Sequence, residues 1–428
     1  MRTESSLLLG CIADDFTGAS DLASVLVASG LRVAQFIGIP APLAELEQDV
    51  DAVVIALKTR TLPAADAVAQ SLDALAWLRA RHAHQVYFKY CSTFDSTSAG
   101  NIGPVIDALM DTLGTDFTVA CPALPDNGRT VYQGHLFVGE ALLSDSGMRQ
   151  HPLTPMTDAN LVRVLQAQTR RRVGLLGHAV LAKGVEAACE RAATLRATGV
   201  HVAIVDAISN EDLMRLAPVV AGMPLVTGGS GLAMGLAGNF GVMPSMHAAA
   251  LPPAQGARAI IAGSCSQATQ RQVAHFVGRG GQALGLDPLR IAAGHSAVAE
   301  TLAWAGPRLS DGPVLVYSSA EAGAVRAVQE VLGVQEAGAL VEHCLAAISR
   351  GLVEQGVGRL VVAGGETSGA CVQALEIERL RIGAAIDPGV PWCHASSPAA
   401  RASGMHIALK SGNFGSDDFF TRAFEVLE

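Results

Sequence analysis

The feature that most constrains the fold is a repeated alternation between short apolar runs and amphipathic stretches of helical length. In the first half of the chain, the apolar runs lie at 7–13, 32–38, 52–58, 86–90, 117–122, 173–177, 201–207 and 224–229. Between them, stretches such as 21–30, 64–82 and 184–199 are amphipathic. Strands that alternate with helices of this length predict crossover units and a mainly parallel sheet flanked by helices.

One segment, 238–258, interrupts this rhythm. It contains three prolines and several glycines and has no clear helix or strand period, so we interpret it as a linker. The alternation then restarts, with apolar runs at 259–264, 313–319, 359–366, 381–386 and 406–412. A chain of 428 residues favours two or three domains over one. We therefore expect two α/β domains, at 1–240 and 258–428.

Composition narrows the classes of protein to which the chain can belong. Half of the residues are hydrophobic, and the formal net charge is −9. This charge argues against nucleic acid and anionic membrane surfaces as partners. Eight scattered cysteines form no CxxC pair, which favours a reducing cytoplasm over a disulfide scaffold. No uninterrupted apolar stretch approaches about 18 residues, so we expect no membrane span.

The first apolar run ends in the stretch ADDFTGASDLA, where two aspartates precede an expected helix. In open parallel sheets, ligands bind beyond the carboxyl ends of the strands, which is where Asp14 and Asp15 are expected. Gly18 would allow a close approach to the backbone, and a helix start offers unpaired N–H groups. One aspartate is enough to cap a helix. The second therefore favours a substrate-binding or catalytic role over an ordinary turn.

Three further strand ends carry polar residues. The stretch ALKTRTLP (56–63) supplies Arg60, although a solvated basic loop would look the same. The stretch YFKYCSTFDSTSAGNIGP (87–104) supplies Lys89 and Asp95 among many hydroxyls, which suits a polyhydroxylated, anionic small molecule better than a self-capped turn. In the third stretch, at 121–138, PDNGR is by itself only a turn signal.

The second half of the chain uses glycine loops instead. Buried strands run into AGSCSQATQ (262–270) and AGGETSGAC (363–371), each followed by a helix start rich in Ser and Thr. Such helix starts present backbone N–H groups, which predicts a phosphate cradle. A third loop is KSGNFG (410–415). Neither a Walker A loop nor a dinucleotide fingerprint occurs, and the histidines lack metal spacing, so we expect no protein-built metal site.

Together these stretches resemble the four-carbon acid sugar kinases, and within them the 3-oxo-tetronate kinases. The matching stretches are IADDFTGASDLA, KYCSTFDSTSAGNIGPV, CPALPDNGRTVYQGHLFV, VTGGSGLA, AGSCSQATQRQ, AGGETSGACVQAL, PGVPWC and IALKSGNFGSDDFF. They occur in this order between residues 11 and 420, so the resemblance spans nearly the whole chain.

The resemblance implies an N-terminal acid-sugar-binding domain and a C-terminal nucleotide-binding domain, with the active site in the cleft between them. It implies ATP-dependent phosphorylation of the C4 hydroxyl of a 3-oxo-tetronate (3-dehydro-erythronate). The sugar site would be lined by Asp14, Asp15, Arg60, Lys89 and Asp95. ATP would be held by Ser264, Gly364, Gly365, Glu366, Thr367 and Gly412. In related kinases of reduced tetronates, the loop that corresponds to DSTSAGN contains an arginine. The candidate position in this chain is Ser98, and this difference favours a 3-oxo substrate.

Phosphoryl transfer gives these residues expected roles. The reaction needs mainly positioning and charge stabilisation, with a carboxylate near the attacking hydroxyl to accept its proton. We expect Asp15, and after it Asp95, to be this base. Arg60 or Lys89 would bind the substrate carboxylate, since arginine can do so with two parallel hydrogen bonds. Mg²⁺ would arrive with ATP, held by the phosphates and by a carboxylate such as Glu366.

Three alternatives stay open at this stage. An NAD-dependent dehydrogenase would need a dinucleotide loop where ADDFTG places acidic residues instead. A non-catalytic protein that binds acid sugars would have the same binding residues. A D-threonate or erythronate kinase of the same family would share the motifs. The chain is also compatible with a homo-oligomer.

Overall fold

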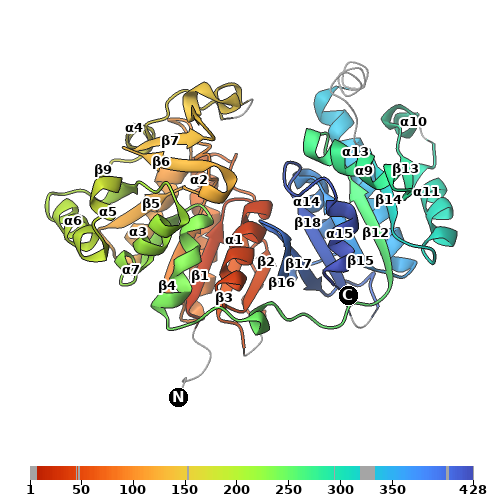
Figure 1. Cartoon of the computed structure of the whole chain (residues 1–428), viewed down its shortest axis with the longest axis horizontal. Coiled ribbons are helices and arrows are strands. Elements are labelled where there is room, and N and C mark those ends of the chain that lie inside the picture. Colours follow the sequence, from red (N-terminus) through yellow and green to blue (C-terminus); the bar gives the residue numbers. More distant parts are fainter. Residues whose placement is uncertain are drawn as a thin grey trace. The chain divides into compact units, whose positions relative to one another are not determined.

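The computed structural model describes residues 7–44, 46, 49–151, 154–293, 295–318, 333–401 and 404–427. The chain forms two compact units, Met1–Ala249 and Ala250–Glu428 (Figure 1). The division falls inside the aperiodic segment 238–258. Within the described ranges, no helix is both long enough and apolar enough to cross a bilayer.

The first unit is built on a sheet of parallel strands in the spatial order β2-β3-β1-β4-β11-β5-β10-β9. The strands are β1 Leu9–Ala13, β2 Val33–Ile37, β3 Ala52–Ala56, β4 Gln85–Lys89, β5 Thr118–Cys121, β9 Val173–Leu176, β10 Val202–Val205 and β11 Leu225–Gly228. Parallel neighbours need crossover connections, which the intervening helices supply. The predicted mainly parallel α/β arrangement is confirmed here.

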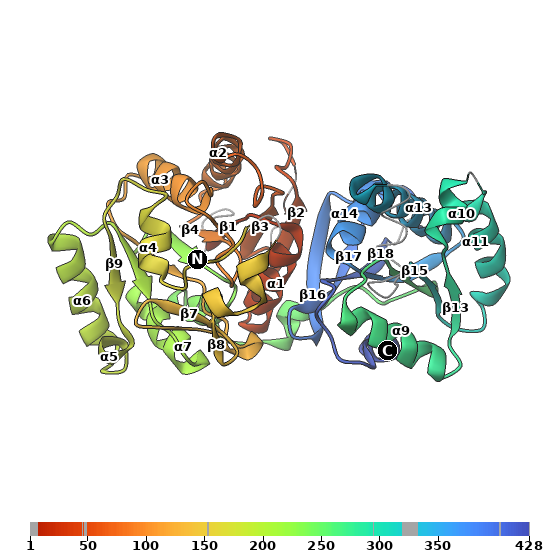
Figure 2. The same ribbon diagram turned by 90° about the horizontal axis from the view of Figure 1, so that it is seen from above.

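Helices cover both faces of this sheet, with α2 and α3 on one face and α1 and α7 on the other (Figure 2). The helices of the unit are α1 Phe16–Ala28, α2 Ala64–Ala80, α3 Ile102–Leu113, α4 Leu161–Gln166, α5 His178–Leu181, α6 Val185–Ala197, α7 Asn210–Val219 and α8 Leu236–Asn239. The connection that leaves β1 passes β3 and leads to β2, on one side of β1. The connection that leaves β3 passes β1 and leads to β4, on the other side of β1. The order therefore reverses beside β1, and ligands bind at such switch points in open α/β sheets.

The polar stretch at 121–138 and the residues directly after it form a small antiparallel sheet that the sequence analysis did not predict. Its strands are β6 Arg129–Tyr132, β7 His135–Val138 and β8 Ala141–Leu142. The turn between β6 and β7 has positive φ at Gln133 (49°) and Gly134 (72°), as two-residue hairpin turns require. Buried Asp206 accepts both backbone N–H groups at 2.8 Å, so a carboxylate at the end of β10 fixes the hairpin.

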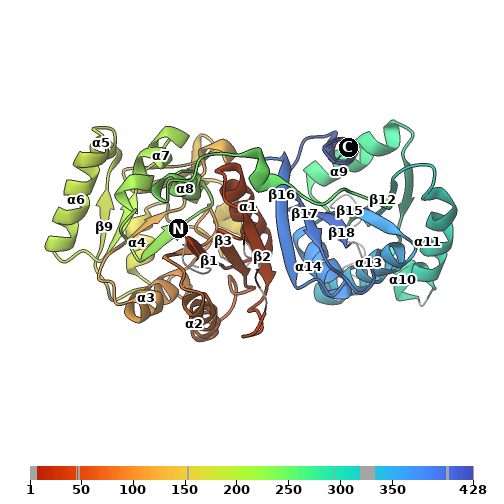
Figure 3. The ribbon, with the colours of Figure 1, turned by 90° about the horizontal axis from the view of Figure 1, so that it is seen from below.

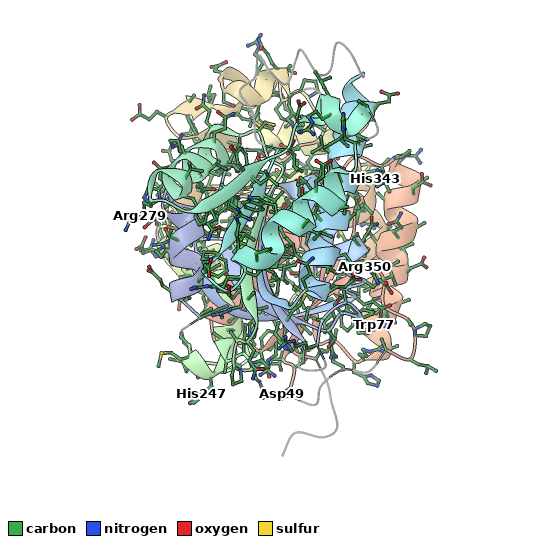
Figure 4. All side chains as sticks on the ribbon, turned by 90° about the vertical axis from the view of Figure 1, so that its right-hand side faces the viewer. Asp49, Trp77, His247, Arg279, His343 and Arg350 are labelled. Carbon is green, nitrogen blue, oxygen red and sulfur yellow. The ribbon has the colours of Figure 1, made fainter. Side chains whose placement is uncertain are left out.

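Trp77, labelled in Figure 4, anchors α2 to the edge of the first unit's sheet. Its ring lies 5.3 Å from the ring of Phe36 in β2, and its indole N–H donates to the carbonyl of Ala41 at 3.1 Å. The guanidinium of Arg81 stacks on the other side, 3.4 Å from the ring centre. These contacts hold the helix that carries the chain from β3 to β4.

The second unit has a mixed sheet in the order β13-β14-β12-β15-β18-β17-β16. The strands are β12 Ala257–Ala262, β13 Gln282–Gly285, β14 Val314–Tyr317, β15 Val357–Ala363, β16 Arg379–Asp387, β17 Val390–Ala395 and β18 Met405–Lys410. From β13 to β18 neighbours are parallel, but β17 is antiparallel to both β18 and β16. The hairpin turns through Gly389, whose φ is 76°. Strand β17 was not predicted, because a turn two residues long left no helix to separate it from β16.

In the second unit, α13 and α14 lie on one face of the sheet and α9 on the other (Figure 3). The helices are α9 Gln267–Gly278, α10 Pro288–Ala292, α11 Ala297–Ala305, α13 Val334–Glu354, α14 Gly365–Ala374 and α15 Phe419–Glu425. A buried cluster that includes Phe276, Trp392 and Phe420 packs α9 and α15 against the strands. This packing fixes the start of α9 beside the strand ends that carry the glycine loops.

Candidate active site

Parallel register brings three loops of the first unit to one edge of its sheet. Ala13, the last residue of β1, pairs with Ala56 of β3 and with Lys89 of β4. The loops are also joined through the backbone of Asp14. Its N–H donates to the carbonyl of Lys89 at 3.1 Å, and its carbonyl accepts the N–H of Arg60 at 3.1 Å. The predicted residues that follow β1 and β3 therefore meet the end of β4.

Asp15 fills the capping role that a single aspartate can fill. Its side chain accepts the backbone N–H of Gly18 at 3.0 Å, which caps α1, and it also accepts the hydroxyl of Thr17 at 3.0 Å. Burial raises the pKa of Asp15, but the positive charges of Arg60 and Lys89 outweigh burial and leave this pKa below its ordinary value. The carboxylate is therefore ionised at neutral pH.

Arg60 joins the two adjacent aspartates. Its Nε and Nη2 atoms donate to the two carboxylate oxygens of Asp14 at 2.9 and 2.8 Å, and Nη2 also donates to Asp15 at 2.7 Å. Burial lowers the pKa of Arg60, but the two carboxylates outweigh it and raise that pKa well above its ordinary value. In the described part of the chain, Nη1 donates to no residue, so two N–H groups are available to a ligand.

Lys89 is a buried lysine next to Asp15. Its Nζ is 3.7 Å from Asp15 Oδ1, and the side chain is 5% exposed. A Cβ atom on Gly18 would overlap both the Lys89 ammonium and the Asp15 carboxylate. Glycine is thus required at position 18 because a larger side chain would collide with the Lys89 ammonium. The sequence analysis gave a different reason, namely that Gly18 would let a ligand approach the backbone. The structure brings together Asp14, Asp15, Arg60 and Lys89.

Asp95 lies in the loop after β4 but makes no hydrogen bond to those four residues. Its two oxygens accept the hydroxyl of Thr93 at 2.6 Å and the thiol of Cys91 at 3.0 Å. Between Thr93 and Asp95, fully buried Phe94 has a φ of 53°, which is strained for an aromatic residue. Burial raises the pKa of the Cys91 thiol to about 11, and nearby Arg60 acts against this shift. Cys91 therefore donates to Asp95 and is also influenced by the charge of Arg60.

The second unit brings its glycine loops to one edge as well. Strands β12, β15 and β18 are neighbours, with Ala262 paired to Ala363 and Ala363 paired to Lys410. The loops that follow therefore leave the sheet at the same level. The N–H of Gly364 donates to the carbonyl of Lys410 at 2.8 Å, and that of Ser264 donates to the carbonyl of Ala363 at 3.2 Å. Helices α9 and α14 both begin at this edge, and helix starts favour anions.

The expected ATP residues of these loops are in contact with one another. A Cβ on Gly364, where φ is 133°, would lie 2.8 Å from Thr367 Oγ1 and 3.2 Å from the Ser264 nitrogen. A Cβ on Gly412 would overlap Ser264 Oγ. In the remaining loop, a Cβ on Gly263 would overlap Thr367 Oγ1, so all three loops require a glycine for close packing. Gly365 and Glu366 form the exposed first turn of α14.

Metal ligands are sparse around both edges. Across the described ranges, no group of three or more His, Cys, Asp or Glu side chains is placed to hold a metal ion. The carboxylate in the first turn of α14 is that of Glu366. This donor set fits a magnesium ion that is bound mainly by nucleotide phosphates, because Mg²⁺ keeps few protein ligands.

Comparisons with known proteins divide the chain in the same way as its two kinds of loop. Residues 9–236 match a family model described as "Sugar-binding N-terminal domain", and residues 259–420 match one described as "Nucleotide-binding C-terminal domain". A curated 3-oxo-tetronate kinase of Pseudomonas savastanoi is 55% identical over 423 residues, which cover 98% of this chain and 97% of the relative. The chain belongs to the 3-oxo-tetronate kinase family of four-carbon acid sugar kinases.

A further curated relative and two solved structures match nearly the whole chain. A 3-oxo-tetronate kinase of Cupriavidus necator is 54% identical, over 98% of this chain and 97% of its own length. A crystal structure of a Salmonella typhimurium protein matches with a TM-score of 0.90 at 44% identity, covering 98% of this chain and 99% of that one. A Haemophilus influenzae protein matches with a TM-score of 0.83 at 43% identity, over 98% and 100%.

The sequence analysis did not predict one polar pair near the cluster formed by Asp14, Asp15, Arg60 and Lys89. Asp21 is buried in α1, and the hydroxyl of Ser230 donates to it. Burial raises the pKa of Asp21, and the charge of Lys89 counteracts part of that shift. The charge of Lys89 therefore acts on a second carboxylate besides that of Asp15. The available signal was an acidic residue inside the otherwise apolar helix stretch GASDLASVLVA.

Asn101 was also missed as a structural anchor. Its buried side-chain amide donates to the backbone carbonyls of Thr59, Arg60 and Leu62 at 2.8, 3.3 and 3.1 Å. It thereby ties the Arg60 loop to the start of α3, 41 residues further along the chain. Nothing in the sequence marks this contact, because a carbonyl acceptor is present at every residue.

Proposed function

We propose that the protein is an ATP-dependent kinase that phosphorylates the C4 hydroxyl of 3-oxo-tetronate (3-dehydro-erythronate), giving 3-oxo-tetronate 4-phosphate and ADP. The observation that carries the proposal is a pair of unlike sites. A charged cluster of Arg60 and Lys89 with two aspartates lies in the unit that matches a sugar-binding model, and three phosphate-type loops lie in the unit that matches a nucleotide-binding model. The names of the relatives at 54–55% identity support the substrate.

The substrate carboxylate would bind to Arg60. Two of this guanidinium's terminal donors are engaged by Asp14 and Asp15, and these bonds hold the plane of the group in one orientation. The remaining terminal nitrogen can then donate to the substrate without a cost in side-chain freedom. Lys89 adds a second positive charge close by.

Asp15 would orient the C4 hydroxyl and accept its proton as the oxygen attacks the γ-phosphorus. The new O–P bond forms as the bond between that phosphorus and ADP breaks. An ionised carboxylate suits this role, because phosphoryl transfer depends more on positioning than on a strong base. Asp95 is the second candidate, since its hydrogen bonds are to Cys91 and Thr93 of its own loop and not to Arg60, where the substrate would bind.

ATP would bind at Ser264, at the Gly364–Thr367 turn and at Gly412, with its phosphates facing backbone N–H groups at the starts of α9 and α14. Mg²⁺ would be held by the phosphates and by Glu366, and when bound it neutralises charge that develops on the transferring phosphoryl group. Transfer requires both substrates to meet away from water. We therefore propose that the two units close on their substrates and that ATP hydrolysis without the acid sugar is slow.

We also propose a cytoplasmic location, which supplies ATP. In support, Cys11, Cys91, Cys121, Cys189, Cys265, Cys344, Cys371 and Cys393 are all free of disulfides. The oligomeric state stays a prediction.

The proposal is tested by ADP release from the purified protein with Mg²⁺, ATP and one acid at a time. The panel contains both enantiomers of 3-oxo-tetronate, threonate and erythronate, with EDTA as the metal control. We expect turnover with one 3-oxo-tetronate enantiomer and its loss in EDTA. Turnover only with a reduced tetronate would move the protein to a sister activity. Binding of an acid without any ADP release would favour a non-catalytic binding protein.

A further inference from the structure

Lys410 is a fully buried lysine at the nucleotide edge of the second unit. It is the last residue of β18, and it is one of four lysines in the chain. Its Nζ donates to Thr269 Oγ1 at 3.1 Å, to the Ser411 carbonyl at 3.0 Å and to the Gly412 carbonyl at 3.1 Å. The side chain therefore folds back beneath the loop that it precedes.

No counter-charge to this lysine is found among the described residues. Titratable side chains on the elements around it are Arg271 and His275 of α9, Arg359 of β15, Glu366 of α14, His394 of β17, His406 of β18, and Asp417 and Asp418 of the following loop. Among the residues described, no carboxylate lies within ion-pair distance of Lys410, and Asp417 is paired with Arg271. Burial lowers the pKa of Lys410 to about 7. A buried cation without an anion is costly, and nearby negative charge relieves that cost.

Lys410 also fixes the orientation of the Gly412 peptide. The Gly412 carbonyl accepts three donors: Ser266 Oγ at 2.6 Å, Thr269 Oγ1 at 2.9 Å and Lys410 Nζ at 3.1 Å. In a planar trans peptide, the carbonyl and the next N–H point in opposite directions. The N–H of Asn413 is therefore turned away from the start of α9.

The charge state of Lys410 decides whether all of its bonds can form. An ammonium has three N–H donors, which matches the three oxygens in contact with it. A neutral amine has two, so one of the oxygens would lose its donor. Deprotonation therefore loosens the loop that carries Gly412.

We propose that Lys410 is a positioning residue of the nucleotide site, and that it takes up a proton when nucleotide phosphates bind beside the Gly412 loop. The phosphates supply the counter-charge that the described side chains do not provide, and the ammonium in return holds the loop in its binding conformation. The inference rests on the proposed nucleotide site. It adds to that site a coupling between nucleotide binding and protonation.

The coupling is measured by isothermal titration calorimetry of the full chain with ADP and Mg²⁺ at pH 8.5, where ADP itself is fully ionised. Titrations in two buffers of different ionisation enthalpy give the number of protons exchanged. For the wild type we expect uptake of about half a proton or more, and a Kd that weakens by up to about tenfold per pH unit from pH 7.5 to 8.5.

Two variants separate positioning from folding. Lys410→Met keeps the length of the chain but removes the charge and the donors, so we expect no proton uptake and a Kd that no longer changes with pH. Lys183→Met, at an exposed lysine of the first unit, should behave like the wild type. If Lys410→Met does not fold, the wild-type uptake still decides the question. Tight ADP binding without proton uptake would overturn this inference and leave the kinase proposal standing, whereas no ADP binding by the wild type would refute both.

Discussion

The hydrogen-bonded group of Arg60 and the two aspartates is the part of the proposed sugar site whose loss can be predicted in most detail. Replacing Arg60 by lysine keeps the positive charge but removes the planar geometry. A lysine ammonium presents its donors from one point, so it cannot span both oxygens of Asp14 and also reach Asp15. In the wild type these bonds are 2.7 to 2.9 Å long, and the Asp14 side chain is 5% exposed.

The expected cost follows from that burial. A lost hydrogen bond to a charged group costs about 1.5–3 kcal/mol, and removing a charge from a buried pair costs about 3–5 kcal/mol. Because lysine keeps the charge, we expect about 2–3 kcal/mol for Arg60→Lys. In a unit of this size, each 1 kcal/mol lowers Tm by about 2–4 °C, so the shift should be about 4–12 °C.

Scanning calorimetry measures the stability change, and steady-state kinetics should show kcat/KM for the acid sugar falling about 100-fold. The matched control is Arg163→Lys. Arg163 forms the same two-bond pair with Asp158 at 2.9 and 2.7 Å, but its side chain is 64% exposed. Exposed pairs contribute about 0–1 kcal/mol, so this variant should be nearly silent. Equal effects of the two substitutions, or a normal kcat/KM in Arg60→Lys, would refute the reasoning.

Three other predictions concern the same unit. Gly18→Ala places a methyl group against Lys89 and Asp15, so KM for the acid sugar should rise at least about tenfold while KM for ATP stays unchanged; parallel changes in both would contradict this. Because the pKa of Asp15 is lowered in the fold, its stabilisation is present above its ordinary pKa and is lost as pH falls. The free energy of unfolding should therefore drop below about pH 4, and less steeply in Asp15→Asn, as urea titrations would show. Asn101→Asp places a carboxylate beside three backbone carbonyls, so it should lower the free energy of unfolding by about 2–3 kcal/mol. Urea titrations measure this change, and an unchanged free energy of unfolding would contradict the anchoring role of Asn101.

Most of the parallel part of the fold was predictable because its strands are separate apolar runs. Strand β1, for example, is fully buried, and a helix of 13 residues follows it. The parallel strand β13 was missed, because its four residues are largely half-exposed and form no apolar run. The antiparallel additions lack this signal. The β6–β7 hairpin reads as a polar turn, since its strands are half-exposed and four residues long. Strand β17 is joined to β16 by a short turn that the period of the apolar runs does not reveal.

The site was predictable where its residues directly follow strands. Asp14, Asp15 and Lys89 lie at ends that parallel register must bring together. The partners that orient them were not predictable, because a contact such as that of Ser230 with Asp21 joins residues 209 positions apart. The same holds for Lys410, whose acceptors are backbone carbonyls and one hydroxyl. Such contacts depend on packing rather than on residue type.

The most direct test of the account is to identify the phosphorylated product by ³¹P NMR with proton coupling, after incubation of the protein with 3-oxo-tetronate, ATP and Mg²⁺. The account predicts a monoester phosphorus signal coupled to the two protons on C4, appearing together with ADP. Inorganic phosphate alone, or a phosphorus signal coupled to the proton on C2, would contradict it.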